Sequence, residues 1–283
     1  FPAAGGTVGV VVAAALGDVA APFPGSTLNL PHGLMFGPDR NADTFADLYV
    51  ASEGGSEILV FSGNAALPAF LGALVNNASG FISGPTYMTP GPNNSLLVSS
   101  RGGGSVLRFD IATGRYRGEV VPSTRGGVAG PHGLLLEPTR LLVVSQDTHQ
   151  VLAYGTLPTG NYESQFLRDD GIFRPRAVTL ASNHQLYSAF RDPADSDTLI
   201  VQAWSQTNNT QLGTIVDEEL FGVISGFCIF GAIDEVYDVA VTSDLTRIYV
   251  SLQLSCGRVL LLMFQGPSDP MTSGDFLGVV AAD

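Results

Sequence analysis

Lysine is absent from this 283-residue sequence, so its thirteen Lys+Arg cations are all arginine. Acidic residues number 26, which gives a formal net charge of −13 at pH 7. A surface of this sign repels nucleic acid and anionic membranes, so neither is expected as a partner. Cations and neutral glycans suit such a surface better.

Long apolar runs are also missing, although hydrophobic residues make up 45% of the chain and charged residues only 14%. A helix needs about eighteen consecutive apolar residues to cross a bilayer, and no run reaches that length. The sequence therefore predicts a chain with no membrane span.

Cysteine is scarce, with only Cys228 and Cys256. Neither has the histidine or acidic neighbours that a metal ligand or nucleophile needs. We therefore expect a disulfide between them in an exported protein, with two buried free thiols as the alternative. A nucleophile elbow, a Walker loop, a CxxC pair and an HExxH helix are all absent.

The chain begins at Phe1 rather than Met, as expected if a leader has been removed or if the chain is a fragment. Three N-glycosylation sequons lie in polar, turn-like stretches, at Asn77, Asn93 and Asn208. Together with the predicted disulfide, they favour a glycoprotein that is secreted, extracellular or held at the cell surface.

What the sequence does contain is a repeated β pattern, clearest from Pro131 to Leu167. Four short runs rich in Leu, Val and Tyr are separated there by Pro, Gly, Asn and Asp, which is the chemistry of strands and turns. A lone four-stranded sheet of this size leaves two apolar faces uncovered. It must therefore stack on similar sheets.

The repeat recurs five times. In four copies the second strand follows the start of the first by eleven residues, and in the first copy a longer turn at 40–47 extends this to seventeen. Five repeats of about fifty residues predict an all-β β-propeller with five clear four-stranded blades. The copies start at His32, Thr86, His132, Arg176 and Asp238.

We expect the propeller to span residues 28–283, after an apolar N-terminal strand arm at 1–27. The interval between the fourth and fifth starts is longer than the others, and its excess is the apolar stretch 220–233. This stretch indicates either a degenerate sixth blade or an insertion at the rim. The expected blades are 31–75, 84–121, 131–168, 174–218 and 235–282.

Four phrases carry a resemblance to a known superfamily: PHGLMFGPD, DLYVAS, SVLRFDIATGRYRGEVV and GPHGLLLEP. They resemble the repeats of NHL-type β-propellers, in which P-x-G-hydrophobic begins the innermost strand and LYV the second. The resemblance covers roughly residues 28–283. It implies the fold and leaves the activity open, because such blades serve lyases, lactonases and binding modules.

The innermost strands of a propeller line its axial channel, so the repeat-starting residues are expected to form an axial binding ring. Two imidazoles and a carboxylate would bind a divalent metal, Zn²⁺ or Ca²⁺, and leave a position for an activated water. Arg176 would hold a substrate carboxylate. This alternative function is a metal-dependent lyase or hydrolase, with His32, His132 and Asp238 as the metal ligands.

The resemblance limits this alternative. The amidating-lyase branch implies three histidines, and Asp238 departs from that set. The lactonase branch uses an acid-and-Asn set on the inner strands, and the inner positions here hold no Glu or Asn, so a lactonase is not expected. The alternative to a binding site is a purely structural role, in which the histidines line the wall of the channel and Arg176 forms an ion pair with Asp238.

A further acidic turn lies in the fourth blade. Three of its carboxylates would offer oxygen ligands to Ca²⁺, but no Gly or distal Glu completes an EF-hand loop. We expect a solvated turn there. Its carboxylates are Asp192, Asp195 and Asp197.

The N-terminal segment TVGVVVA, at residues 7–13, is similar to the outermost strands FLGALV, YRGEVV and FLGVVA. Every blade already has such a strand, so this one is surplus. It either pairs within its own chain, with 220–233 as one option, or adds to an exposed sheet edge of another copy. Its strand residues are Thr7, Val8, Val10, Val11 and Val12.

The leading hypothesis follows from that surplus strand. We expect a non-catalytic, exported propeller that acts as a structural subunit, forming a filament or oligomer by self-association, or as a surface-binding module.

Overall fold

The computed structural model describes residues 27–64, 69–155, 160–167, 174–192, 194–195, 198–207, 210–220, 224–228, 232–268 and 274–282. The chain divides into two compact units, Phe1–Ser123 (unit 1) and Thr124–Asp283 (unit 2), and each is described by itself. The N-terminal arm, Asn208 and Asp197 lie outside the described residues.

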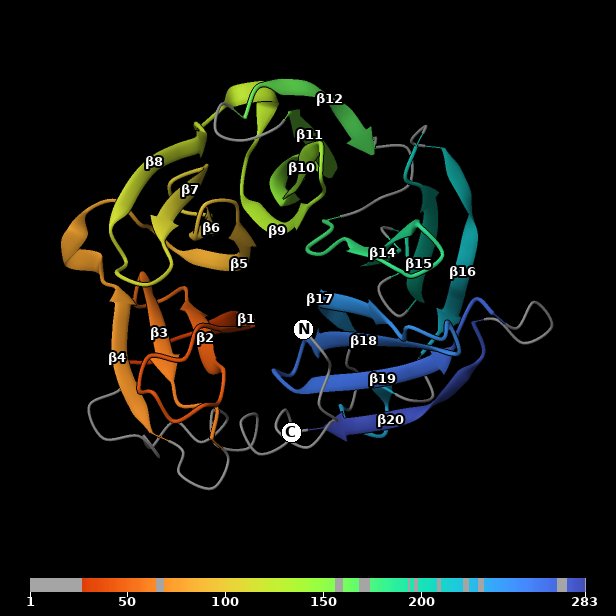
Figure 1. Ribbon diagram of the computed structural model, residues 1–283. Coiled ribbons are helices and arrows are strands. Elements are labelled where there is room, and N and C mark those ends of the chain that lie inside the picture. The colour runs from red at the N-terminus through yellow and green to blue at the C-terminus, as the bar shows by residue number, and fades with distance from the viewer. Residues whose placement is uncertain are drawn as a thin grey trace. The chain divides into compact units, whose positions relative to one another are not determined.

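Unit 1 holds two four-stranded antiparallel sheets, and in each the strands lie side by side in chain order (Figure 1). A short 3₁₀ turn, η1 (Asn77–Ser79), lies between them. The first sheet contains β1 (Pro31–Gly37), β2 (Asp47–Ser52), β3 (Glu57–Phe61) and β4 (Phe70–Val75). The second contains β5 (Pro85–Gly91), β6 (Ser95–Ser100), β7 (Ser105–Asp110) and β8 (Tyr116–Val121).

Unit 2 holds three sheets of the same kind. Two 3₁₀ turns, η2 (Arg125–Gly127) and η3 (Gln146–Thr148), belong to the first of them. The third sheet contains β9 (Pro131–Leu136), β10 (Arg140–Ser145), β11 (Gln150–Gly155) and β12 (Tyr162–Leu167). The fourth contains β13 (Thr179–Leu180), β14 (Gln185–Arg191), β15 (Thr198–Ser205) and β16 (Gln211–Glu219). The fifth contains β17 (Ile233–Val241), β18 (Arg247–Leu254), β19 (Val259–Gln265) and β20 (Phe276–Ala282).

The second strands form the core of the sheets. All six residues of β2 (DLYVAS) and all six of β6 (SLLVSS) are buried, as expected for strands covered on both faces. Their runs of Leu, Val and Tyr are the ones from which the sequence predicted strands. The predicted fold class, an all-β propeller with five four-stranded blades, is confirmed.

A serine at the end of the second strand ties the blade to the chain that leads into its first strand. The Ser52 hydroxyl donates to the Asn29 carbonyl and accepts from the Asn29 N–H, both at 3.0 Å. A buried serine that satisfies both backbone groups fixes the start of the first strand against the end of the second. The same two hydrogen bonds join Ser100 to Ser83 and Ser145 to Ala129.

The glycine of the PHG motif allows neighbouring first strands to approach closely. A Cβ on Gly33 would lie 2.8 Å from the Cα of Tyr87, and a Cβ on Gly133 would lie 2.5 Å from the carbonyl oxygen of Arg176. The Gly133 N–H donates to that same carbonyl at 2.8 Å. Glycine is therefore required here for close contact between backbones of adjacent blades within each unit.

Among its described residues, the apolar stretch 220–233 forms a strand only at Ile233, the first residue of β17. The N–H of Ile224 donates to the Leu220 carbonyl, and the N–H of Cys228 donates to the Ile224 carbonyl, both at 2.8 Å, which is a helical turn. All three side chains are buried in the largest apolar cluster of unit 2. These residues therefore belong to an insertion that packs on the sheets of unit 2, and they do not contribute to a sixth blade.

The predicted disulfide is present and joins Cys228 to Cys256, with their Cα atoms 6.1 Å apart. It links the helical turn to the connection between β18 and β19. The described residues contain no helix that combines the length and apolar character needed to cross a bilayer.

Candidate functional site

In three blades, the residue that follows the last serine of the second strand lies beside the start of the first strand. Its N–H donates to the carbonyl of the residue before that strand, at 3.0 Å for Glu53, 2.9 Å for Arg101 and 3.2 Å for Gln146. Each of these blades thus places a polar residue beside the start of its first strand. These positions were not predicted from the sequence.

In unit 1 this arrangement creates a cluster around Glu53. His32 Nε2, on β1, lies 2.5 Å from Glu53 Oε2, and Arg101 Nη1, which follows β6, lies 3.2 Å from Glu53 Oε1. The hydrogen bond from His32, with a smaller contribution from Arg101, lowers the pKa of Glu53 despite its partial burial. Glu53 is therefore an ionised acceptor shared by two cationic or potentially cationic groups.

In unit 2 the corresponding cluster forms around Glu235, on β17. Arg174 Nη2 lies 3.0 Å from Glu235 Oε1, and Arg176 Nε lies 3.0 Å from Glu235 Oε2, close enough for an ion pair but without hydrogen-bond geometry. Gln146 Nε2 donates to Glu235 Oε2 at 3.4 Å. The Arg176 guanidinium also lies over the ring of Tyr237, 4.9 Å from its centroid.

Asp238 takes no part in this cluster. Arg176 pairs with Glu235, so the ion pair between Arg176 and Asp238 that the sequence suggested is not found among the described residues. Asp238 Oδ1 instead accepts the Val239 N–H at 2.8 Å, next to a bulge in β17. The side chain keeps water-accessible surface, yet surrounding protein desolvates it enough to raise its pKa to about 6.

The two remaining repeat-starting residues are buried on first strands, Thr86 on β5 and His132 on β9. Within unit 1 the fold brings together His32 and Glu53, and within unit 2 it brings together Arg176 and Glu235. The predicted metal ligands, His32, His132 and Asp238, are divided between the two units. A metal bound by these three residues stays a prediction.

The outer strand of every blade has a distinct and repeated structure. Two bulges interrupt its pairing with the third strand, so the second and fifth residues of the outer strand have no partner across the ladder. No strand lies beyond these outer strands in the part of the chain that the structure describes. The third residue is glycine in four blades, and a Cβ there would meet nothing within 4 Å: Gly72, Gly118, Gly213 and Gly278.

The outer strand β20 differs from the other four in its exposed side chains. Both of its bulge residues are large, apolar and exposed, Leu277 at 42% and Val280 at 50%. The bulge residue that corresponds to Leu277 is Arg117 in β8 and Glu163 in β12. In β16 only one of the two, Leu212, is exposed and apolar. In β4 the two bulge residues are also apolar, but Leu71 is half-buried and Leu74 is buried. Among the described outer strands, β20 is therefore the one in which both bulge residues are large, apolar and exposed.

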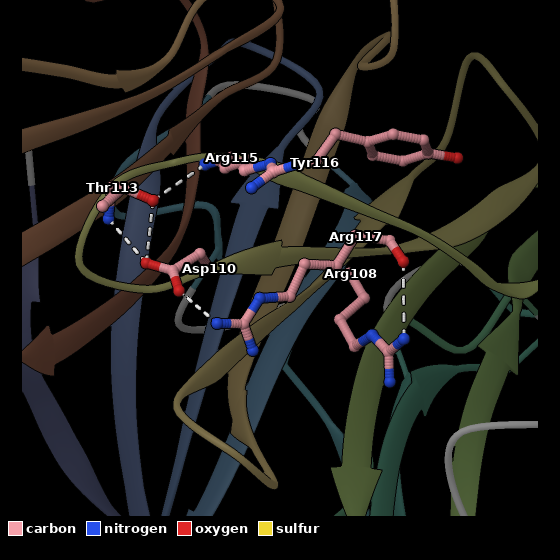
Figure 2. Close-up of a pocket in the computed structure, with 6 residues that line it drawn as sticks. All are labelled: Arg108, Asp110, Thr113, Arg115, Tyr116 and Arg117. Carbon is pink, nitrogen blue, oxygen red and sulfur yellow. Dashed lines mark hydrogen bonds and ion pairs between the residues drawn. The ribbon is translucent and has the colours of Figure 1, made fainter.

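A shallow hollow borders the hairpin of β7 and β8 in unit 1, and Figure 2 shows its lining side chains. Arg117 forms an ion pair with Asp110, and the Thr113 hydroxyl donates to the same carboxylate at 2.9 Å. The Thr113 hydroxyl and the backbone N–H groups hold the pKa of Asp110 below its usual value. These contacts explain the hollow as a hydrogen-bonded hairpin turn, in which Asp110 is held by Thr113 and Arg117.

Comparisons with known proteins support the fold. No family model matches the chain, and a search of curated proteins finds no similar sequence. Among solved structures, a nidogen/laminin complex matches with a TM-score of 0.59 and 10% identity, over 89% of this chain and 80% of that one. A functionally unknown protein from Desulfotomaculum acetoxidans matches with a TM-score of 0.56 and 14% identity, over 89% and 71%.

A third match is a catalytically inactive virginiamycin B lyase from Staphylococcus aureus with quinupristin, with a TM-score of 0.52, 16% identity and coverage of 84% and 66%. The matches include propeller-type structures of different functions. At these identities they show the β-propeller fold alone. The expected membership of the NHL-type superfamily is therefore supported only at the level of the propeller fold.

Proposed function

We propose that this chain is an exported, non-catalytic β-propeller that assembles through its N-terminal strand. In this proposal residues 7–12 of one copy pair with the β20 edge of a second copy. The observation that carries it is the open, apolar edge of β20, with Leu277 and Val280 exposed and with open space beside Gly278. An apolar strand without charges is the partner that such an edge fits.

The two strands have matching patterns. The arm reads TVGVVV and β20 reads FLGVVAA, and each has glycine at its third position and apolar residues around it. When a strand is added to a sheet edge, backbone hydrogen bonds supply affinity and alternate side chains supply specificity. The bulges of β20 blunt the edge against flat strands, which favours a partner with the same pattern.

Charge favours β20 over the outer strands β8 and β12. Arg117 and Glu119 are exposed on β8, and Tyr162 and Glu163 are exposed on β12. An arm that carries no charge before Asp18 would leave these charges poorly solvated if it covered them. Covering Val280 and Leu277 instead removes only apolar surface from water, which stabilises the pairing.

The proposal includes export. A disulfide between Cys228 and Cys256 is typical of proteins that mature outside the reducing cytosol. The sequon residues Asn77 and Asn93 are both exposed, as carriers of glycans must be. Glycosylation at these two sites is part of the proposal.

Substitutions on the edge test the mechanism. We expect Val280→Asp to abolish assembly, because a carboxylate on the β20 edge would be buried against the arm. Val10→Asp in the arm should have the same effect. The measurement is the molar mass in solution by size-exclusion chromatography with light scattering, at several protein concentrations.

The matched control is Leu212→Asp, which places the same charge at an equally exposed bulge residue on β16. It should leave assembly unchanged. Far-UV circular dichroism and the thermal midpoint establish that each variant folds. If Val280→Asp and Leu212→Asp assemble equally well, or if the wild-type mass is that of one chain at every concentration, the arm docks within its own chain and the mechanism is wrong.

A further inference from the structure

The connection from β1 to β2 brings three carboxylates together within unit 1. One oxygen from each of Asp39, Asp43 and Asp47 lies within 4.8 Å of the other two. We call residues 39–47 the acidic loop. Asp39 is exposed, Asp43 is half-buried and Asp47 is fully buried, so the three carboxylates reach from the surface to the first residue of β2.

Asp47 provides the observation that points to a ligand. Its side chain is 0% exposed, and its Oδ2 accepts the Arg40 N–H at 2.7 Å. Its Oδ1 is buried and has no hydrogen-bond donor among the described residues. A buried carboxylate oxygen without a donor is costly, and a cation bound against it would remove that cost.

The other two carboxylates also keep capacity for a ligand. Asp39 Oδ2 accepts the Thr44 N–H at 2.8 Å, and Asp43 Oδ1 accepts the Phe45 N–H at 3.0 Å. Each carboxylate oxygen has about two acceptor sites, so each of these atoms can bind one further partner. The Phe45 N–H also lowers the pKa of Asp43, which keeps this carboxylate ionised.

We propose that the acidic loop is a Ca²⁺-binding site formed by Asp39, Asp43 and Asp47. The donors are all oxygens, which Ca²⁺ and Mg²⁺ prefer over softer ligands. Ca²⁺ accepts an irregular set of oxygen ligands, whereas Mg²⁺ demands near-ideal octahedral geometry and usually keeps several water ligands. A loop that offers three carboxylates at different depths is therefore better suited to Ca²⁺.

The sequence of the loop supports the same ion. Asp39, Asn41 and Asp43 have the spacing of the first, third and fifth residues of an EF-hand loop. The sixth position of that loop is a glycine because the chain turns sharply there. Thr44, in the corresponding place, has a φ of 75°, in the left-handed region. The acidic loop has no glutamate at the twelfth position, and Asp47 supplies the buried carboxylate instead.

Calcium titration of the full-length chain tests this site. We expect CaCl₂ to raise the thermal midpoint, with a dissociation constant of about 10⁻⁴–10⁻³ M, the range of extracellular calcium modules. MgCl₂ should bind at least tenfold more weakly. Asp47→Asn and, separately, Asp43→Asn should each weaken calcium binding at least tenfold, as measured by calorimetry.

The control is Asp195→Asn, which removes one charge from the exposed acidic turn of the fourth blade and should leave calcium binding unchanged. With EDTA present, Asp47→Asn should be at least as stable as wild type, because it removes an uncompensated buried charge. If Asp47→Asn does not fold, the calcium affinity of Asp43→Asn tests the proposal. The proposal is wrong if no calcium binding occurs at about 10 mM, if Mg²⁺ binds equally well, or if Asp195→Asn and Asp43→Asn have equal effects.

Discussion

Glu53 and Glu235 organise the polar residues around the first strands, and each does so by pairing with two or more nitrogen-bearing side chains. Glu53 holds His32 and Arg101, and Glu235 holds Arg174 and Arg176. Asp238 remains apart, next to a bulge and without a cationic partner among the described residues. This difference in partners explains why the pKa of Glu53 is lowered and that of Asp238 is raised.

Asp238 therefore makes stability depend on pH in an unusual direction. Its pKa is about 6 in the folded chain and about 3.8 in the unfolded chain, so folding favours the protonated form. The resulting destabilisation is absent below about pH 4, develops as the pH rises from about 4 to about 6, and is complete above about pH 6. We expect Asp238→Asn to stabilise the protein at pH 7.5 by about 1 kcal/mol, since water reaches this side chain and screens it.

Urea unfolding of both proteins at pH 4.5 and pH 7.5 measures this effect. The advantage of Asp238→Asn should be largest at pH 7.5 and should shrink at pH 4.5. An advantage of equal size at both pH values would mean that the ionised Asp238 is not disfavoured in the folded chain.

The sequence could predict the residues that begin the first strands, but it could not predict their partners. His32, Arg176 and Asp238 were found because the repeats align them. Glu53 directly follows β2, and Glu235 lies three residues before Asp238 on β17. Which of these glutamates meets which arginine depends on side-chain reach. One signal was available, because Glu53 and Arg101 directly follow the repeated serine of the second strand.

At the scale of elements, the close approach of neighbouring first strands depends on the glycine of the PHG motif. We expect Gly133→Ala to destabilise the protein by about 1–3 kcal/mol, the cost of forcing a methyl group into a packed site. The new Cβ would lie 2.5 Å from the Arg176 carbonyl oxygen and would break the hydrogen bond that Gly133 donates to it. Thermal and urea unfolding measure the loss.

Gly213→Ala is the matched control, because a Cβ on this glycine of β16 would meet nothing within 4 Å. It should change stability by less than about 0.5 kcal/mol, because the added methyl group contacts no neighbouring atom. Equal effects of the two substitutions would mean that the Gly133 contact does not limit packing.

The strands themselves were predictable because short apolar runs alternate with turn residues throughout the chain. The two bulges in each outer strand were not, since FLGALV reads as a plain strand and only pairing with the third strand reveals the unpaired residues. The turn at 224–228 was also missed, because an apolar run without periodicity does not distinguish a buried helical turn from a strand. The acidic loop was visible as a long turn, but its carboxylates were not recognised as a group.

At the scale of the whole molecule, repetition is what made the fold predictable. Five copies of one pattern can bury their apolar faces only against one another, and the structure has five such sheets. The same repetition hides the function, because propellers with different activities share it. In the proposed function, the N-terminal arm and the apolar edge of β20 are the two features that concern assembly.

The most direct test of the central claim compares the full-length chain with a chain that begins at Thr27. Electron microscopy and light scattering of both proteins, at equal concentration, report their assembly. We predict filaments or closed oligomers for the full-length chain and single copies for the shortened chain. Single copies of the full-length chain, or unchanged assemblies of the shortened one, would contradict the proposal that the arm joins one copy to the next.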